Sequence, residues 1–101
     1  MMDLLQLKGK NIVVMGVANE RSIAWGIAKR LFDVGANVIF TYRKERSKKK
    51  IEKQIANYTE HKTAIVECDF NRDESIAQAF ETIGNEFKVI HGIVHSVAFA
   101  H

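Results

Sequence analysis

Apolar residues in this chain gather in four short runs, and segments with helical periodicity separate them. The runs cover 11–15, 37–42, 63–68 and 90–97 and are continuous or β-branched, which predicts parallel strands covered on both faces. Between the runs, apolar residues recur every three or four positions, which predicts three helices. The three stripes are Ile23, Ala24, Ile27, Ala28, Leu31 and Val34; Ile51, Ile55 and Tyr58; and Ile76, Phe80, Ile83 and Phe87.

The spacing of these runs predicts the fold class. Successive expected strands begin about 26 to 27 residues apart, close to the length of one strand–helix unit. With right-handed crossovers, we expect an α/β fold: the first half of a doubly wound, Rossmann-type parallel sheet with strand order 3-2-1-4. A flavodoxin-like order fits the same alternation. Because the last strand would be left as an apolar edge, we expect residues 1–101 to be the amino-terminal part of a longer domain.

Local signals mark the ends and faces of the expected helices. Gly35 follows the first stripe and is expected to end that helix. Asn71, with Glu74 three residues later, predicts an N-terminal capping box for the third helix. Gly26 lies within the first helix, and we expect it to let that helix pack closely on the strand.

Composition and the single cysteine limit the class of protein and the compartment in which it is expected. The chain has 101 residues, 47% hydrophobic and 27% charged, as in one soluble globular domain. No run resembles a signal peptide or is long enough to span a membrane. Cys68 alone cannot form an internal disulfide, and no Cys and His residues have metal-ligand spacing. We therefore expect a cytoplasmic protein with no metal site and no membrane association.

The stretch 13–26 has the pattern of an anion-binding junction. An apolar strand ends at Gly16, and a helix is expected to begin near Ser22. The first N–H groups of a helix lack partners and carry the positive end of its dipole, so they attract anions. A glycine at the turn permits close approach of a phosphate. Because the spacing differs from Gly-x-Gly-x-x-Gly, this junction alone does not establish a nucleotide site.

The net charge of +3 is concentrated in one segment. Residues 43–53 hold seven Lys or Arg against two Glu, a local charge of +5, which leaves −2 for the rest of the chain. NAD-binding units place an acidic residue near the end of the second strand, where this chain has Arg43 and Lys44. Their cationic groups suit a 2′-phosphate, so we interpret them as selecting NADPH. We interpret residues 48–50 as a solvated helix face.

Few other residues are candidates for a catalytic or ligand-binding role. Asp69 ends the third strand, and its carboxylate could accept a hydrogen bond from an adenine amino group or serve in a turn or helix cap. Cys68 is expected to be a buried small residue, because no histidine is placed to activate it. Trp25 and Phe80 are expected in the core. The histidines share no spacing with carboxylates or serines and are expected to have surface or packing roles: His61, His91, His95 and His101.

Four segments together carry a resemblance: Gly16, Ser22-Ile23-Ala24, residues 40–47 (FTYRKERS) and residues 95–100 (HSVAFA). From about Leu7 to the last residue, the chain resembles the amino-terminal part of bacterial enoyl-acyl-carrier-protein reductases of the short-chain dehydrogenase/reductase superfamily. The G-x5-S-I-A-x-G spacing and the S-[IV]-[AG]-F-A segment are specific to that branch.

The resemblance implies a role for each matched residue. Gly16, Ser22 and Ile23 would contact the pyrophosphate and ribose; Arg43, Lys44 and Ser47 would hold the 2′-phosphate; Asp69 and Phe70 would border the adenine. Ser96, Val97 and Ala98 would pass beside the nicotinamide ribose, Ala100 would offer its backbone to the thioester, and Phe99 would line the acyl pocket.

The resemblance also implies a reaction. Family members transfer a hydride to a trans-2-enoyl thioester on acyl carrier protein in fatty-acid synthesis, usually as homotetramers. The cofactor expected here is NADPH, with NADH possible but weaker. The family's catalytic tyrosine and lysine, in a Y-x6-K motif, match no residue of this chain. We therefore expect no catalytic residue, no turnover, and weak or absent NADPH binding by these 101 residues alone.

Three alternatives stay open. A ketoacyl-thioester reductase of the same superfamily would typically have Asn-x-Ala-Gly where this chain has Ser96–Ala100. A non-catalytic flavodoxin-like binding module of the receiver type would need acidic residues at strand ends for a metal, but the first strand ends in Met15 and Gly16. Nucleic-acid binding through the lysine run would be expected to use interleaved aromatic residues, which are nearly absent there.

Overall fold

The fold alternates strands and helices along the chain, as the hydrophobic pattern predicts. The computed structural model describes residues 7–17, 23–58, 62–69 and 71–95. Its elements are β1 (Asn11–Met15), α1 (Ile23–Asp33), β2 (Asn37–Tyr42), α2 (Glu45–Ile55), β3 (Thr63–Glu67), α3 (Asp73–Phe87) and β4 (Gly92–His95).

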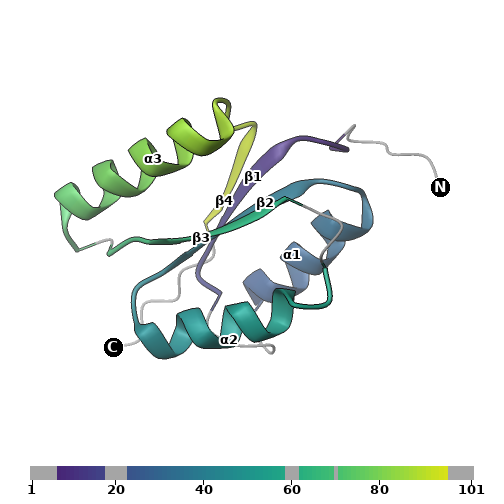
Figure 1. Cartoon of the computed structure of the whole chain (residues 1–101), viewed down its shortest axis with the longest axis horizontal. Helices are drawn as coiled ribbons and strands as arrows, with labels where there is room; N and C mark the ends of the chain where they lie inside the picture. Colours follow the sequence, from purple (N-terminus) through teal and green to yellow (C-terminus); the bar gives the residue numbers. More distant parts are fainter. Residues whose placement is uncertain (1–6, 18–22, 59–61, 70, 96–101) are drawn as a thin grey trace.

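The described strands form one parallel sheet in the order β3-β2-β1-β4, so the predicted strand order 3-2-1-4 is confirmed. α1 and α2 cover one face of the sheet, and α3 covers the other (Figure 1). This arrangement has three layers, with helices on both faces of a parallel sheet, as doubly wound nucleotide-binding folds do. The predicted α/β, Rossmann-type fold class is therefore confirmed.

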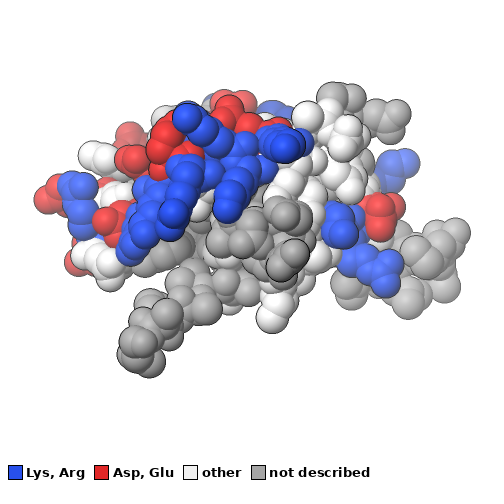
Figure 2. All heavy atoms as spheres, turned by 90° about the horizontal axis from the view of Figure 1, so that it is seen from below, with Lys and Arg blue, Asp and Glu red and all other residues white. Residues whose placement is uncertain are grey.

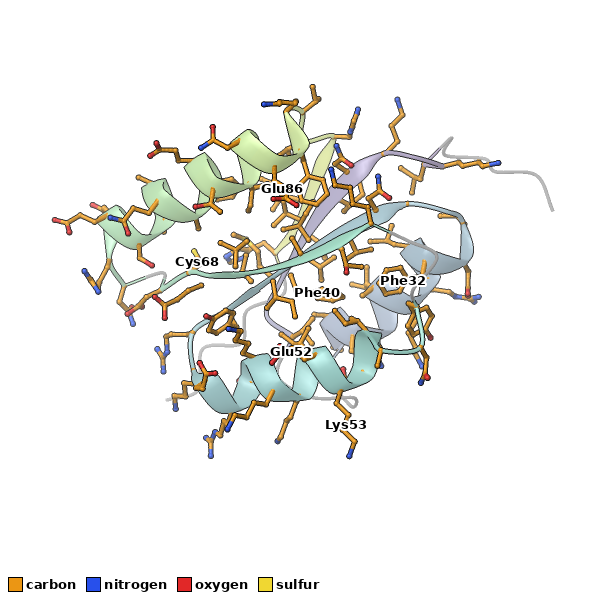
Figure 3. The ribbon with its side chains drawn as sticks, in the orientation of Figure 1. Phe32, Phe40, Glu52, Lys53, Cys68 and Glu86 are labelled. Atoms are coloured by element: carbon orange, nitrogen blue, oxygen red, sulfur yellow. The ribbon has the colours of Figure 1, made fainter. Side chains whose placement is uncertain are left out.

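Two clusters of buried side chains hold the layers together. On the α1 and α2 face, Phe40 of β2 points into the helix layer (Figure 3), where its ring lies 6.1 Å from that of Trp25 and 6.2 Å from that of Phe32. On the α3 face, Ile39 packs with Ile83. Alternate residues of β2 therefore serve opposite faces, which is the arrangement expected of a strand buried on both sides.

Several local predictions are confirmed. α1 ends in a Schellman motif, in which Gly35 has φ +85° and donates to Phe32 O, while Ala36 donates to Leu31 O. Trp25 is buried, and Phe80 packs half-buried against the core.

Other local predictions are wrong. Gly26 is exposed, and a Cβ built on it meets nothing within 4 Å, so it does not serve close packing. The capping box at Asn71 is absent, because Asn71 N–H donates to Asp69 Oδ1 at 3.0 Å and the helix begins later, with Arg72 as N-cap. Tyr58 follows the end of α2, where its ring stacks on Phe32 at 4.5 Å.

Among the residues that the structure describes, no helix is long and apolar enough to cross a bilayer. Within the same residues, no group of three or more His, Cys, Asp or Glu is placed to hold a metal ion.

Candidate functional site

The glycine turn lies at the carboxyl edge of the sheet, directly after β1. Gly16 has φ +100°, a conformation that residues with a Cβ rarely adopt. Val17 then returns to the core beside α1, and α1 begins at Ile23, whose side chain is 76% exposed. The backbone at Gly16 is thus free of side-chain bulk at the edge where ligands bind to such sheets.

The basic segment lies at the same edge. β1 and β2 are parallel and in register, with Val14 opposite Phe40, so Arg43 and Lys44 leave the sheet at the end where Gly16 does. Both cationic side chains are exposed. The sequence-based hypothesis of a dinucleotide site requires this placement, because a diphosphate at the glycine turn and a 2′-phosphate belong to one ligand.

The first turn of α2 is built on Lys44. Lys44 is the N-cap residue, and its carbonyl accepts hydrogen bonds from the N–H groups of Ser47 at 2.9 Å and Lys48 at 3.2 Å. Ser47 lies half-buried on this turn. The cations at the end of β2 therefore stand at the positive end of a helix dipole, which adds to their attraction for an anion.

The outer face of α2 carries a separate row of positive charge. Arg46, Lys49, Lys50 and Lys53 recur at helical spacing and are exposed, and Figure 2, which looks at the molecule from below, shows Lys and Arg gathered on this face. We call these four residues the outer row. Lys53 points away from the sheet (Figure 3). The interpretation of this face as solvated holds for Lys49 and Lys50.

The interpretation of Lys48 as part of that solvated face is wrong. Its side chain is half-buried, and its Nζ lies 5.6 Å from the centre of the Tyr42 ring. The reason is helical geometry: Lys48 precedes buried Ile51 by three residues, so the two lie on the face of α2 that is turned toward the sheet. That spacing was available in the sequence as a signal.

Asp69 has the turn role that the sequence allowed. Its Oδ1 accepts the Asn71 N–H, and its own N–H donates to Ser75 Oγ at 2.8 Å. These bonds hold the segment after β3 at the carboxyl edge. Among the described residues, the other carboxylate oxygen, Oδ2, has no hydrogen-bond partner. A role beside adenine is compatible with this geometry.

Cys68 is structural in character. It is 1% exposed, its N–H donates to Tyr42 O at 2.7 Å, and its sulfur lies on the α3 side of the sheet (Figure 3). Burial, and secondarily the negative charge of Asp69, raise the pKa of the Cys68 thiol, which keeps it protonated and unreactive.

β4 ends at the same edge of the sheet as β1, since His95 is in register with Met15. Seven predicted residues lie outside the described residues: Ser22, Phe70, Ser96, Val97, Ala98, Phe99 and Ala100.

Known proteins resemble this chain over nearly its whole length. It is 55% identical over 94 residues to the enoyl-[acyl-carrier-protein] reductase [NADH] FabI of Enterococcus faecalis, covering 93% of the chain and 36% of the relative. It is 44% identical to the enoyl-[acyl-carrier-protein] reductase [NADPH] FabI of Staphylococcus aureus, covering 97% of the chain and 38% of the relative. The chain thus spans little more than a third of these relatives.

A solved structure agrees. The Bacillus cereus enoyl-acyl carrier protein reductase, in complex with NADP+ and an indole naphthyridinone, superposes with a TM-score of 0.89 at 45% identity, over 94% of this chain and 37% of that one. The family model described as enoyl-(acyl carrier protein) reductase matches residues 16–101. The chain therefore belongs to the enoyl-(acyl carrier protein) reductase family.

Proposed function

We propose that this chain is the cofactor-binding portion of an NADPH-dependent enzyme that reduces trans-2-enoyl thioesters on acyl carrier protein in fatty-acid synthesis. One observation carries the proposal: the glycine turn after β1 and the cations after β2 lie at the same edge of the parallel sheet. The matched family favours an enoyl thioester over a ketoacyl thioester as substrate. Residues 1–101 would form the amino-terminal part of the dinucleotide-binding domain of a cytoplasmic homotetramer.

Different described residues would bind different parts of the cofactor. Gly16 lets the backbone approach a diphosphate, and the start of α1 at Ile23 directs its dipole toward it. Arg43, Lys44 and Ser47 hold a 2′-phosphate through charge and hydrogen bonds, and Asp69 borders the adenine. Bound NADPH would supply the hydride.

The undescribed residues complete the proposed site. Ser22 would contact the pyrophosphate and Phe70 the adenine. Ser96, Val97 and Ala98 would pass beside the nicotinamide ribose, and Phe99 and Ala100 would meet the acyl thioester.

Charge favours NADPH over NADH. Relatives are named for either cofactor, so the family does not decide. In this chain both residues that follow β2 are cationic and exposed, and neither has an ion pair among the described residues. A 2′-phosphate would neutralise them, whereas the 2′-hydroxyl of NADH would leave them unused.

A cofactor titration followed by amide NMR tests the proposal, since that method detects weak binding and reports folding. We expect NADPH at millimolar concentration to shift the amides of Gly16, Lys44 and Ser47. Arg43→Gln with Lys44→Gln should lower NADPH affinity at least about tenfold, because each charged hydrogen bond contributes about 1.5 kcal/mol or more. NADH affinity should change less than about twofold.

The matched control is Lys50→Gln with Lys53→Gln, which removes the same charge from the outer row. It should leave the cofactor preference unchanged. An equal loss of both cofactors in the Arg43 and Lys44 variant would contradict the proposal. Enoyl reduction by this chain alone would contradict the further expectation that it has no turnover.

A further inference from the structure

The ammonium group of Lys48 occupies a different position from those of the other lysines of α2. Helical side chains tilt toward the N-terminus of their helix, and the Lys48 N–H bonds to Lys44 O one turn earlier. Its ammonium is therefore carried back toward the loop that follows β2. The 5.6 Å separation from the centre of the Tyr42 ring shows where it comes to lie.

Tyr42 fixes that ammonium at the carboxyl edge of the sheet. It is the last residue of β2, and its half-buried ring packs against the core cluster on the α1 and α2 face. A cation within about 6 Å of an aromatic ring is attracted by the ring's negative face. The ring thus restricts a side chain that would otherwise sample many rotamers, and less conformational entropy is lost when an anion binds.

Among the residues that the structure describes, no carboxylate lies within ion-pair distance of the Lys48 ammonium. The ion pair found in the described ranges joins Arg72 to Glu74 at the start of α3. The ammonium therefore lies beside the last residue of β2, which Arg43 and Lys44 follow, and it adds a third positive charge near this edge.

We propose that Lys48, held over Tyr42, is a further residue that determines preference for a 2′-phosphorylated dinucleotide. This inference rests on the proposed function and deepens it. Lys48 lies one helical turn beyond Lys44, so it acts through charge on a ligand whose 2′-phosphate is bound directly by Arg43, Lys44 and Ser47. The ring of Tyr42 is the positioning element.

Lys48→Met tests the role of the charge, and Lys49→Met is its control. Both variants lose one positive charge at adjacent positions, but Lys49 belongs to the outer row and is exposed. We expect Lys48→Met to lower NADPH affinity about fivefold at low salt and to leave NADH affinity within about twofold, with a smaller NADPH effect at high salt. Lys49→Met should change either affinity less than about twofold.

Variants of Tyr42 test the positioning. Tyr42→Phe keeps the ring and should bind NADPH as the unmodified chain does. Tyr42→Leu removes the ring and should reproduce part of the loss seen in Lys48→Met. If the amide NMR spectrum shows that Tyr42→Leu does not fold, the comparison of Lys48→Met with Lys49→Met still tests whether the Lys48 charge contributes to NADPH affinity.

The outcomes separate this inference from the proposed function. Equal NADPH losses in Lys48→Met and Lys49→Met, or equal losses of NADPH and NADH in Lys48→Met, would overturn the role of Lys48. If Arg43 and Lys44 still control cofactor preference in that case, the proposed function stands. Equal losses of NADPH and NADH in the Arg43 and Lys44 variant would overturn both.

Discussion

Val14 of β1 lies opposite Phe40 of β2 in a parallel register, and both side chains are fully buried. This pairing determines the geometry of the candidate site. A slip of the register by one residue would turn these side chains to the wrong face of the sheet, and the two core clusters would be lost. Burial of these side chains sets the register of β1 and β2. The register in turn holds Gly16 and the residues that follow Tyr42 at one edge of the sheet, even if these residues do not contact each other.

The turn at Gly16 should not tolerate a side chain. At φ +100°, Gly16→Ala would place a Cβ in a disfavoured conformation, with a cost of about 1 to 2 kcal/mol in the free energy of unfolding. The added methyl group would also obstruct the approach of a diphosphate. Urea unfolding would measure the first effect and the NADPH titration the second.

Gly26→Ala is the matched control, because it adds the same methyl group ten residues later. A Cβ at Gly26 meets nothing within 4 Å, and alanine is favoured over glycine inside a helix, so we expect stabilisation by about 0.5 to 1 kcal/mol. Destabilisation would show that α1 does need this glycine for close packing, as the sequence pattern suggested. Equal effects of the two substitutions would contradict the special role of Gly16.

The strands and helices could be predicted from the sequence because they depend on the spacing of apolar residues, which is visible in one chain. The sheet order does not follow from that spacing, since a flavodoxin-like order fits the same alternation. Gly35 was also predictable, since helix ends that need a left-handed residue favour glycine. The common edge of Gly16, Arg43 and Lys44 follows from the parallel order alone.

The wrong predictions concern residues whose position depends on contacts with neighbouring side chains. The Asn71 N–H is taken by Asp69, which delays the start of α3, and no spacing rule anticipates that. Tyr58 fits the helical stripe of α2 but packs on Phe32 from beyond the helix end. Lys48 looked like one lysine among several, and its position over Tyr42 depends on which face of α2 turns inward.

Cys68 should make stability depend on alkaline pH. Burial raises the pKa of its thiol in the folded state, so the folded chain disfavours the thiolate. The associated stability is fully present below the pKa of the unfolded thiol and is lost as the pH rises through the folded pKa. Between about pH 8 and about pH 10, urea unfolding should therefore show a smaller loss of stability for Cys68→Ala than for the unmodified chain. Equal losses would contradict this, as would rapid alkylation of the native thiol at neutral pH.

Asn11 should be the most sensitive polar residue at the opposite, amino edge of the sheet. Its Nδ2 donates to Val89 O at 2.8 Å and Phe87 O at 3.3 Å, and its Oδ1 accepts from Asn37 Nδ2 at 3.0 Å. The side chain thereby joins β1 to β2 and to the end of α3. Asn11→Ala removes all three bonds and leaves their partners less well satisfied, so we expect a loss of about 2 to 3 kcal/mol in the free energy of unfolding.

The control for Asn11 is Asn85→Ala, an identical substitution at an exposed position of α3. It should change the free energy of unfolding by about 0.5 kcal/mol or less. Because Asn11 lies at the edge away from Gly16 and Arg43, Asn11→Ala should lower stability while the ratio of NADPH to NADH affinity stays unchanged wherever the chain remains folded. A change in that ratio would mean that the two edges of the sheet are coupled, and the amino edge would then belong to the functional unit.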